Sequence, residues 1–122
     1  MKRILIVDDD SSTTESISSF LIETGYEVKT ASNGMEALEV VKEMNPDLII
    51  TDIRMPKLNG FELYTVLREM NYKKPIIFIS SYDNTDTNGK NLEVFAQIQK
   101  PINIFELNQY IKKALAECGT AA

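Results

Sequence analysis

The chain contains no histidine and no tryptophan, and Cys118 is its only cysteine. One cysteine cannot form an internal disulfide, and without histidine the usual zinc sites and the Ser-His or Cys-His catalytic groups are not available. Much of enzyme chemistry is therefore excluded. The remaining composition, 43% hydrophobic and 25% charged over 122 residues, is typical of one soluble globular domain.

Long apolar runs and a surplus of basic residues are also missing. The longest apolar runs, such as residues 4–7 and 76–79, are far too short to cross a bilayer, and Met-Lys-Arg leads into a strand-like segment rather than a secretory signal. We therefore expect a cytoplasmic protein that does not enter a membrane. The formal net charge of -5 argues against direct binding to nucleic acid, because no basic surplus displaces counterions from phosphates.

Five short segments have the composition of β-strands. Residues 2–7, 47–51 and 75–80 are almost wholly apolar, as strands covered on both faces of a parallel sheet are. Residues 26–31 alternate weakly, and residues 94–98 give a weaker fifth signal. The sequence therefore predicts five strands.

Segments with helical spacing of apolar residues separate most of these strands. They centre on residues 17–24, 37–44, 63–70 and 104–117. Gly25 is expected to close the first helix, Asn33 to cap the second, and Asn103 to start the last. Residues 83–91 are the exception, because Asn, Asp, Thr and Gly prefer turns to helices, so we expect a short or irregular helix there.

This alternation of strands and helices predicts an α/β fold. Right-handed crossovers lay helices on both faces of a sheet, so we expect a doubly wound, five-stranded parallel sheet in the order 2-1-3-4-5. The expected domain covers residues 1–118, followed by a disordered tail over residues 119–122. In this order the winding reverses between the first and third strands, and ligands bind outside their carboxyl ends.

Carboxylates gather at that predicted crevice. Asp8, Asp9 and Asp10 follow the first strand, and Asp52 ends the third. Clustered carboxylates repel one another unless a cation lies between them, and Mg²⁺ prefers oxygen ligands. We expect Asp8, Asp9 and Asp52 to hold Mg²⁺ and Asp10 to cap the first helix. The alternative is that all three residues after the first strand only cap that helix and favour its positive end.

A hydroxyl and an ammonium group are expected at the same edge of the sheet. Ser80 ends the fourth predicted strand, and Lys100 follows the fifth. Either one alone is typical of a turn residue or a solvated surface charge. Together with the ion they would meet the needs of a phosphoryl group on Asp52, whose carboxylate can act as a nucleophile without a general base.

Over nearly its whole length the chain resembles the receiver domains of two-component response regulators. The segment ILIVDDD is similar to the family's first strand with its acidic pair, and LIITDIRMPKLNG to its phosphoacceptor strand and loop. The resemblance implies a flavodoxin-like topology in which Asp52 is the phosphoacceptor and Asp8 and Asp9 are the acidic pair. It also implies that Ser80 is the switch hydroxyl and that Lys100 precedes the family's proline, here Pro101.

The resemblance further implies the cofactor and the partners. Mg²⁺ would be held by Asp8, Asp9 and Asp52 together with the backbone carbonyl of Arg54. A sensor histidine kinase or a phosphotransfer protein would donate the phosphoryl group, and an unidentified downstream protein would respond to it. The chain would then be a signalling module that catalyses only its own phosphorylation and dephosphorylation, not an enzyme in the ordinary sense.

The sequence departs from the family pattern near the switch hydroxyl and in the fifth strand. Ser81 stands where a small residue such as Ala is common, and the ring of Tyr82 could narrow access to the phosphoryl site. Gln97 stands where the family has Tyr or Phe, so we do not expect a rotating aromatic side chain to report phosphorylation. We expect the loop after Ser80 to become ordered instead.

Two other functions remain as alternatives. One is an unphosphorylated interaction module of the same fold, which would have no need of the complete set of site residues. The other is a Mg²⁺-dependent phosphatase or a flavodoxin-like binder. A phosphatase would want a second aspartate where Arg54 stands, and the carboxylates after the first strand would repel a flavin phosphate.

Overall fold

The part of the chain that the structure describes contains five strands and four helices, which alternate up to the fourth strand. The structure is a computed structural model, and the described residues are 2–54, 57–80, 96–99 and 102–120. The elements are β1 (Arg3–Val7), α1 (Ser11–Thr24), β2 (Glu27–Ala31), α2 (Gly34–Met44), β3 (Leu48–Asp52), α3 (Gly60–Glu69), β4 (Ile76–Ser80), β5 (Ala96–Gln99) and α4 (Ile104–Thr120). Residues 83–91, where a short or irregular helix was predicted, lie outside the described residues.

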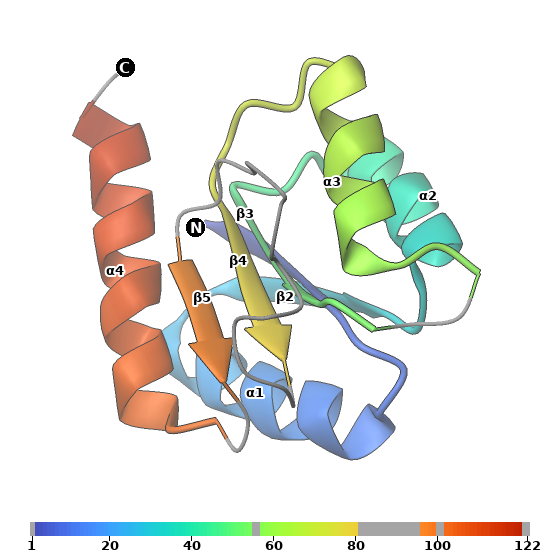
Figure 1. Cartoon of the computed structure of the whole chain (residues 1–122). Helices are drawn as coiled ribbons and strands as arrows, with labels where there is room; N and C mark the ends of the chain where they lie inside the picture. The colour runs from blue at the N-terminus through green and yellow to red at the C-terminus, as the bar shows by residue number, and fades with distance from the viewer. Residues whose placement is uncertain (1, 55–56, 81–95, 100–101, 121–122) are drawn as a thin grey trace.

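The strands form one parallel sheet in the order β2-β1-β3-β4-β5, which confirms the predicted topology. Ile4 of β1 lies opposite Val28 of β2 and Leu48 of β3. The structure therefore places the carboxyl ends of β1 and β3 side by side, where the winding of the sheet reverses (Figure 1).

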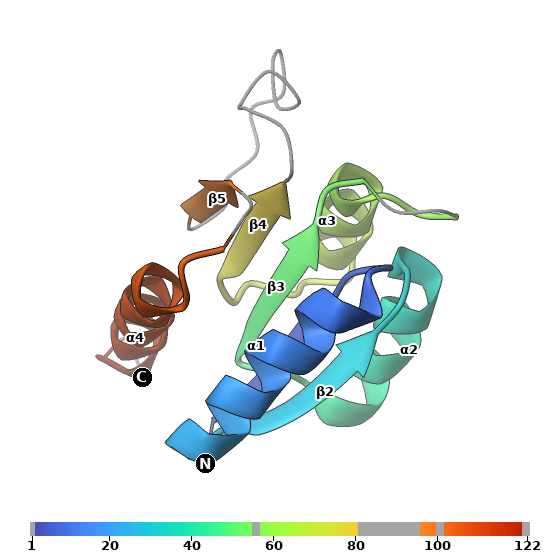
Figure 2. The same cartoon turned by 90° about the horizontal axis from the view of Figure 1, so that it is seen from below.

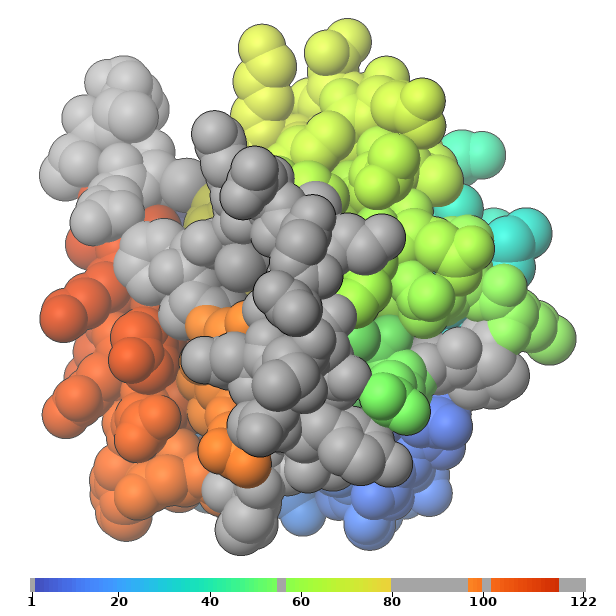
Figure 3. Space-filling model, in the orientation of Figure 1, coloured from blue at the N-terminus to red at the C-terminus, as the bar shows by residue number. Residues whose placement is uncertain are grey.

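Helices cover both faces of the sheet, as the apolar strands require. Ile4 and Ile6 of β1 pack on the side of α1 and α4, whereas Leu5 and Val7 pack on the side of α2 and α3. Both sets are fully buried, because successive side chains of a strand point to opposite faces. Figure 2 shows α1 and α4 on one side of the sheet and α2 and α3 on the other, and Figure 3 shows α4 and α3 at opposite sides of the molecule.

Side-chain caps set the beginnings of all four helices. Asp10 caps α1 and accepts hydrogen bonds from the Ser12 amide at 3.0 Å and the Ser12 hydroxyl at 2.7 Å, which lower the pKa of Asp10. Asn33 caps α2, Asn59 caps α3, and Asn103 accepts from two amides in the first turn of α4. The caps expected at Asp10 and Asn33 are confirmed, as is the start of the last helix at Asn103.

The last helix is longer than predicted. It continues to Thr120, so Gly119 and Thr120 extend the helix instead of beginning a disordered tail. Ala114, Leu115 and Ala116 are strong helix formers, and one glycine costs only about 1 kcal/mol relative to alanine in a helix. Among the described residues, no helix is both long enough and apolar enough to span a membrane.

A carboxylate joins the segments at the amino edge of the sheet, opposite the edge with the clustered aspartates. Asp47, whose side chain is 21% exposed, accepts the Arg3 amide at 2.9 Å and the Lys74 ammonium at 3.0 Å. Burial raises the pKa of Asp47, but the hydrogen bond from Arg3 and the charge and hydrogen bond of Lys74 outweigh burial and leave the pKa below its usual value. The carboxylate therefore stabilises the fold when it is ionised.

We expect Asp47→Asn to lower the free energy of unfolding at pH 7 by about 1–3 kcal/mol, because it weakens bonds to a charged acceptor. The folded pKa lies below the unfolded value of about 3.9, so the contribution is complete above about pH 5, declines below it and is lost as the pH falls through the folded pKa. Urea unfolding of both proteins from pH 7 to pH 2.5 measures this. The exposed Glu39→Gln is the control, and a difference that stayed constant down to the lowest pH would contradict the account.

Candidate magnesium and phosphoacceptor site

Three aspartates meet at the carboxyl edge of the sheet. Asp8 and Asp9 directly follow β1, and Asp52 is the last residue of β3. The two strands are neighbours, with Val7 opposite Thr51, so the residues after Val7 lie beside Asp52. One carboxylate oxygen from each aspartate lies within 4.8 Å of the others.

This cluster combines burial with like charge. Asp8 is 2% exposed and Asp52 is 6% exposed, whereas Asp9 is exposed to solvent. Carboxylates this close repel one another, and burial removes the water that would weaken the repulsion. The donor set, three hard carboxylate oxygens with one side open to water, fits Mg²⁺, which keeps several water ligands.

Backbone hydrogen bonds hold two of the three aspartates in place. The Asp8 amide donates to the Ala31 carbonyl at 3.0 Å, and the Asp8 carboxylate accepts the Asp10 amide at 2.9 Å. The Thr51 hydroxyl donates to the Asp52 carbonyl at 2.9 Å. These bonds tie Asp8 and the Asp52 backbone to the sheet and to its first connections.

The loop from β3 to α3 is closed tightly at its base. The Ile53 amide donates to the Ile79 carbonyl at 3.1 Å, and the Gly60 amide donates to the Ile53 carbonyl at 2.8 Å. A methyl group added to Gly60 would lie 2.6 Å from the Asp52 carbonyl oxygen and 2.9 Å from the Ile53 Cα. Any side chain at Gly60 would thus push on the backbone of Asp52.

The structure describes some of the other predicted site residues and not others. Arg54 is exposed and lies two residues after Asp52, at the start of this loop. Ser80 is the last residue of β4, the strand next to β3, and its backbone lies opposite Gln99. Lys100 follows β5 but lies outside the described residues, as do Pro101, Ser81 and Tyr82. The roles of these residues stay predictions.

Gln97 lies on β5 opposite Phe78, on the face of the sheet that α2 and α3 cover. Its amide nitrogen is buried and has no hydrogen-bond partner within the described ranges. The Phe78 ring instead packs edge-on against Phe61, with ring centroids 5.6 Å apart. That Gln97 takes no part in a phosphorylation switch stays a prediction, which a Gln97→Ala substitution would test.

No role at the site was predicted from the sequence for two glycines that pack near it. Gly34 and Gly60 begin α2 and α3, and both pack against the segment that follows β3. The sequence does carry the same Asn-Gly pair at the start of both helices, and this pair could have drawn attention to the two glycines. The asparagine of such a pair explains the cap, and the close packing that requires glycine is visible only in three dimensions.

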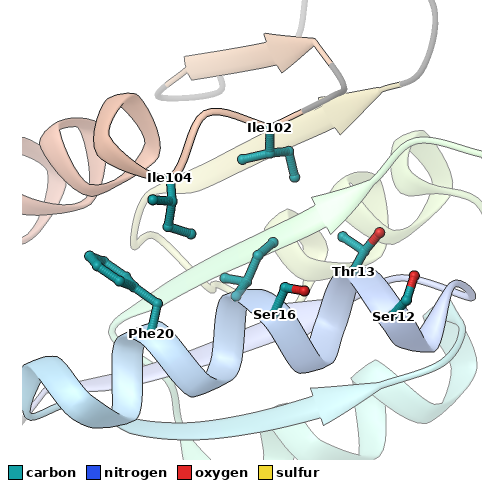
Figure 4. Close-up of a pocket in the computed structure, with 7 residues that line it drawn as sticks. Ser12, Thr13, Ser16, Phe20, Ile102 and Ile104 are labelled. Carbon is teal, nitrogen blue, oxygen red and sulfur yellow. The ribbon is translucent and has the colours of Figure 1, made fainter.

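A groove runs along α1. It encloses about 530 Å³ between α1 and the segment that leads into α4. Its lining residues are Ser12, Thr13, Ser16, Ile17, Phe20, Ile102 and Ile104 (Figure 4). The first two of these lie in the first turn of α1, directly after the aspartates that follow β1. The groove therefore runs along α1 from its first turn, which follows the aspartates in the sequence.

Known proteins share this fold and this sequence pattern. The chain is 38% identical to the transcriptional regulatory protein PrrA of Mycobacterium tuberculosis, over 98% of this chain and 52% of that protein. It is 36% identical to the alkaline phosphatase synthesis transcriptional regulatory protein PhoP of Bacillus subtilis, over 99% of this chain and 51% of that protein. The chain thus spans about half the length of these relatives.

Solved structures agree with the sequence relatives. A CheY-like response regulator receiver domain protein from Methanospirillum hungatei matches with a TM-score of 0.92 and 31% identity, over 100% of this chain and 99% of that one. The response regulator TrrA from Thermotoga maritima, solved in complex with Mg²⁺-BeF, matches with a TM-score of 0.85 and 36% identity, over 94% and 100% of the two chains. The sequence model described as response regulator receiver domain matches residues 4–112, and this chain belongs to that family.

Proposed function

We propose that the chain is a phosphoacceptor receiver in two-component signal transduction, in which Asp52 takes a phosphoryl group from a phosphohistidine of a sensor kinase or phosphotransfer protein. The observation that carries the proposal is the approach of the Asp8, Asp9 and Asp52 carboxylates within 4.8 Å, two of them buried. Such a cluster is costly for a module that only binds partners, because like charges are held together away from water. The acidic site therefore favours a phosphoacceptor over an interaction module of the same fold.

Asp8, Asp9 and Asp52, with the Arg54 carbonyl, would hold the Mg²⁺. When bound, Mg²⁺ offsets the negative charge that gathers on the phosphoryl oxygens. TrrA, which is similar to this chain, was solved with Mg²⁺-BeF, and this supports the assignment.

The nucleophile of the transfer is the Asp52 carboxylate, which needs no general base. A carboxylate oxygen of Asp52 attacks phosphorus, the bond between phosphorus and the donor imidazole nitrogen breaks, and its electron pair stays on that nitrogen, which takes up a proton. Lys100 would pair with the new negative charge, and the Ser80 hydroxyl would donate a hydrogen bond to a phosphoryl oxygen. The added charge then changes the affinity of a downstream protein for this surface.

We expect Mg²⁺ to bind without any phosphodonor. Titration of the isotope-labelled chain should shift the amide signals of residues 8–10 and 52–54, since the ion relieves repulsion there. Asp9→Asn should abolish these shifts, whereas Asp10→Asn should keep them because asparagine also caps a helix. Shifts confined to distant residues, or equal loss in both variants, would refute the assignment.

Phosphorylation should occur once and on Asp52. Incubation with a small acyl phosphate and Mg²⁺ should add the mass of one phosphoryl group, read by intact-mass spectrometry, because the carboxylate needs no protein donor to react. Asp52→Asn and chelation of Mg²⁺ should each prevent the addition. Modification of the Asp52→Asn protein at the wild-type rate would rule out this acceptor, whereas failure of the wild-type chain to gain a phosphoryl group would favour the interaction module.

We place the protein donor on the groove along α1, since the groove is largely apolar and includes the first turn of α1, which follows the aspartates in the sequence. Phe105, next to the lining residue Ile104, is 74% exposed, so its removal should not disturb the core. Phe105→Ala should slow transfer from a phosphohistidine protein by about tenfold, as loss of an interface anchor does. Its rate with a small acyl phosphate should stay unchanged.

The matched control is Met70→Ala at the end of α3, where an apolar side chain is 40% exposed on the other side of the sheet. It should leave both rates unchanged. Equal rates for Phe105→Ala and wild type with the protein donor would place the donor elsewhere.

A further inference from the structure

The first turn of α2 packs against the loop that follows the phosphoacceptor strand. A methyl group added to Gly34 would lie 2.5 Å from the Leu58 carbonyl oxygen and 2.7 Å from the Leu58 Cβ. The first of these is a backbone atom, so a side chain at Gly34 could be accommodated only by moving the loop or the helix. Leu58 lies in the loop that begins at Arg54 and ends at the Gly60 contact with Asp52.

The backbone conformation of Gly34 does not itself require glycine. Gly25 is the only glycine in the described part of the chain with a positive φ, and Gly34 is an ordinary first-turn residue of α2. Alanine is the better helix former at such a position. Glycine is therefore needed here for space and not for backbone freedom.

Side chains hold this turn of α2 in place. The Asn33 side chain accepts the Glu36 amide at 2.9 Å, and the Glu36 carboxylate accepts the Ser32 amide at 2.8 Å. These reciprocal bonds fix the position of Gly34 relative to the end of β2. The turn that Leu58 packs against is thus held in place by its own hydrogen bonds.

The same connection also touches the acidic pair. The Ala31 carbonyl at the end of β2 accepts the Asp8 amide at 3.0 Å, and three residues later Gly34 meets Leu58. One short segment therefore contacts both Asp8, which follows β1, and Leu58, which precedes α3. It links the backbone of the acidic pair to the end of the β3–α3 loop.

We infer that Gly34 is a positioning residue for the ion site: it lets the β3–α3 loop sit close enough to the acidic pair for both to contact one Mg²⁺. This inference rests on the proposed function, since it assumes that the cluster binds the ion. Gly34 acts through Leu58 and touches neither the ion nor the phosphoryl group.

Gly34→Ala tests the inference through Mg²⁺ binding alone, measured by NMR titration of the full chain without a phosphodonor. The expected result is a dissociation constant raised by about tenfold, the lower range for loss of an outer-shell support. Gly25→Ala is the control, because it strains a left-handed helix end with open space around it and should lower stability without changing the dissociation constant. An unchanged constant for folded Gly34→Ala would overturn the inference.

A second pair of variants decides the matter if Gly34→Ala does not fold. Asn33→Ala releases the turn that carries Gly34, and Asn103→Ala removes the same kind of cap from α4. The expected result is weaker Mg²⁺ binding for Asn33→Ala and wild-type binding for Asn103→Ala. Equal constants for the two would overturn the inference, whereas failure of the wild-type chain itself to bind Mg²⁺ would instead refute the proposed function.

Discussion

Repulsion among the carboxylates of Asp8, Asp9 and Asp52, at the carboxyl edge of the sheet, is the constraint that the surrounding structure must satisfy. Asp8 and Asp52 are buried, so water does little to weaken the repulsion between them. Their separation is set by the pairing of β1 with β3 and by backbone hydrogen bonds from both sides. The pairing of the strands thus helps to keep the charges together, and a bound cation would stabilise the folded state further.

The positions of the site residues follow from a rigid framework and two points of close packing. Parallel strands bring their carboxyl ends to one edge, and capped helices start at the same edge. Gly34 and Gly60 let two of these helix starts approach the loop after Asp52 more closely than any other residue would allow. The described parts of the loop, around Ile53 and at Leu58, are consequently contacted from two directions.

The fold and the acidic cluster could be predicted because their signals are local. Apolar strands, helical spacing and turn residues predicted the order of the sheet, and the order alone brought Asp8 and Asp9 next to Asp52. The close packing of Gly34 on Leu58 could not be predicted, because it joins residues that no periodic pattern connects. The end of α4 was missed for a different reason: one glycine is too weak a signal to stop a helix anchored by buried Leu115.

The amino and carboxyl ends of the parallel strands hold separate groups of charged residues. Asp47, Arg3 and Lys74 tie the amino edge together, one strand length away from the carboxylates of the opposite edge. Substitutions that are well separated and share no partner usually change the free energy of unfolding independently. Thermostability could therefore be engineered from the amino edge, while the chemistry of the carboxyl edge stays as it is.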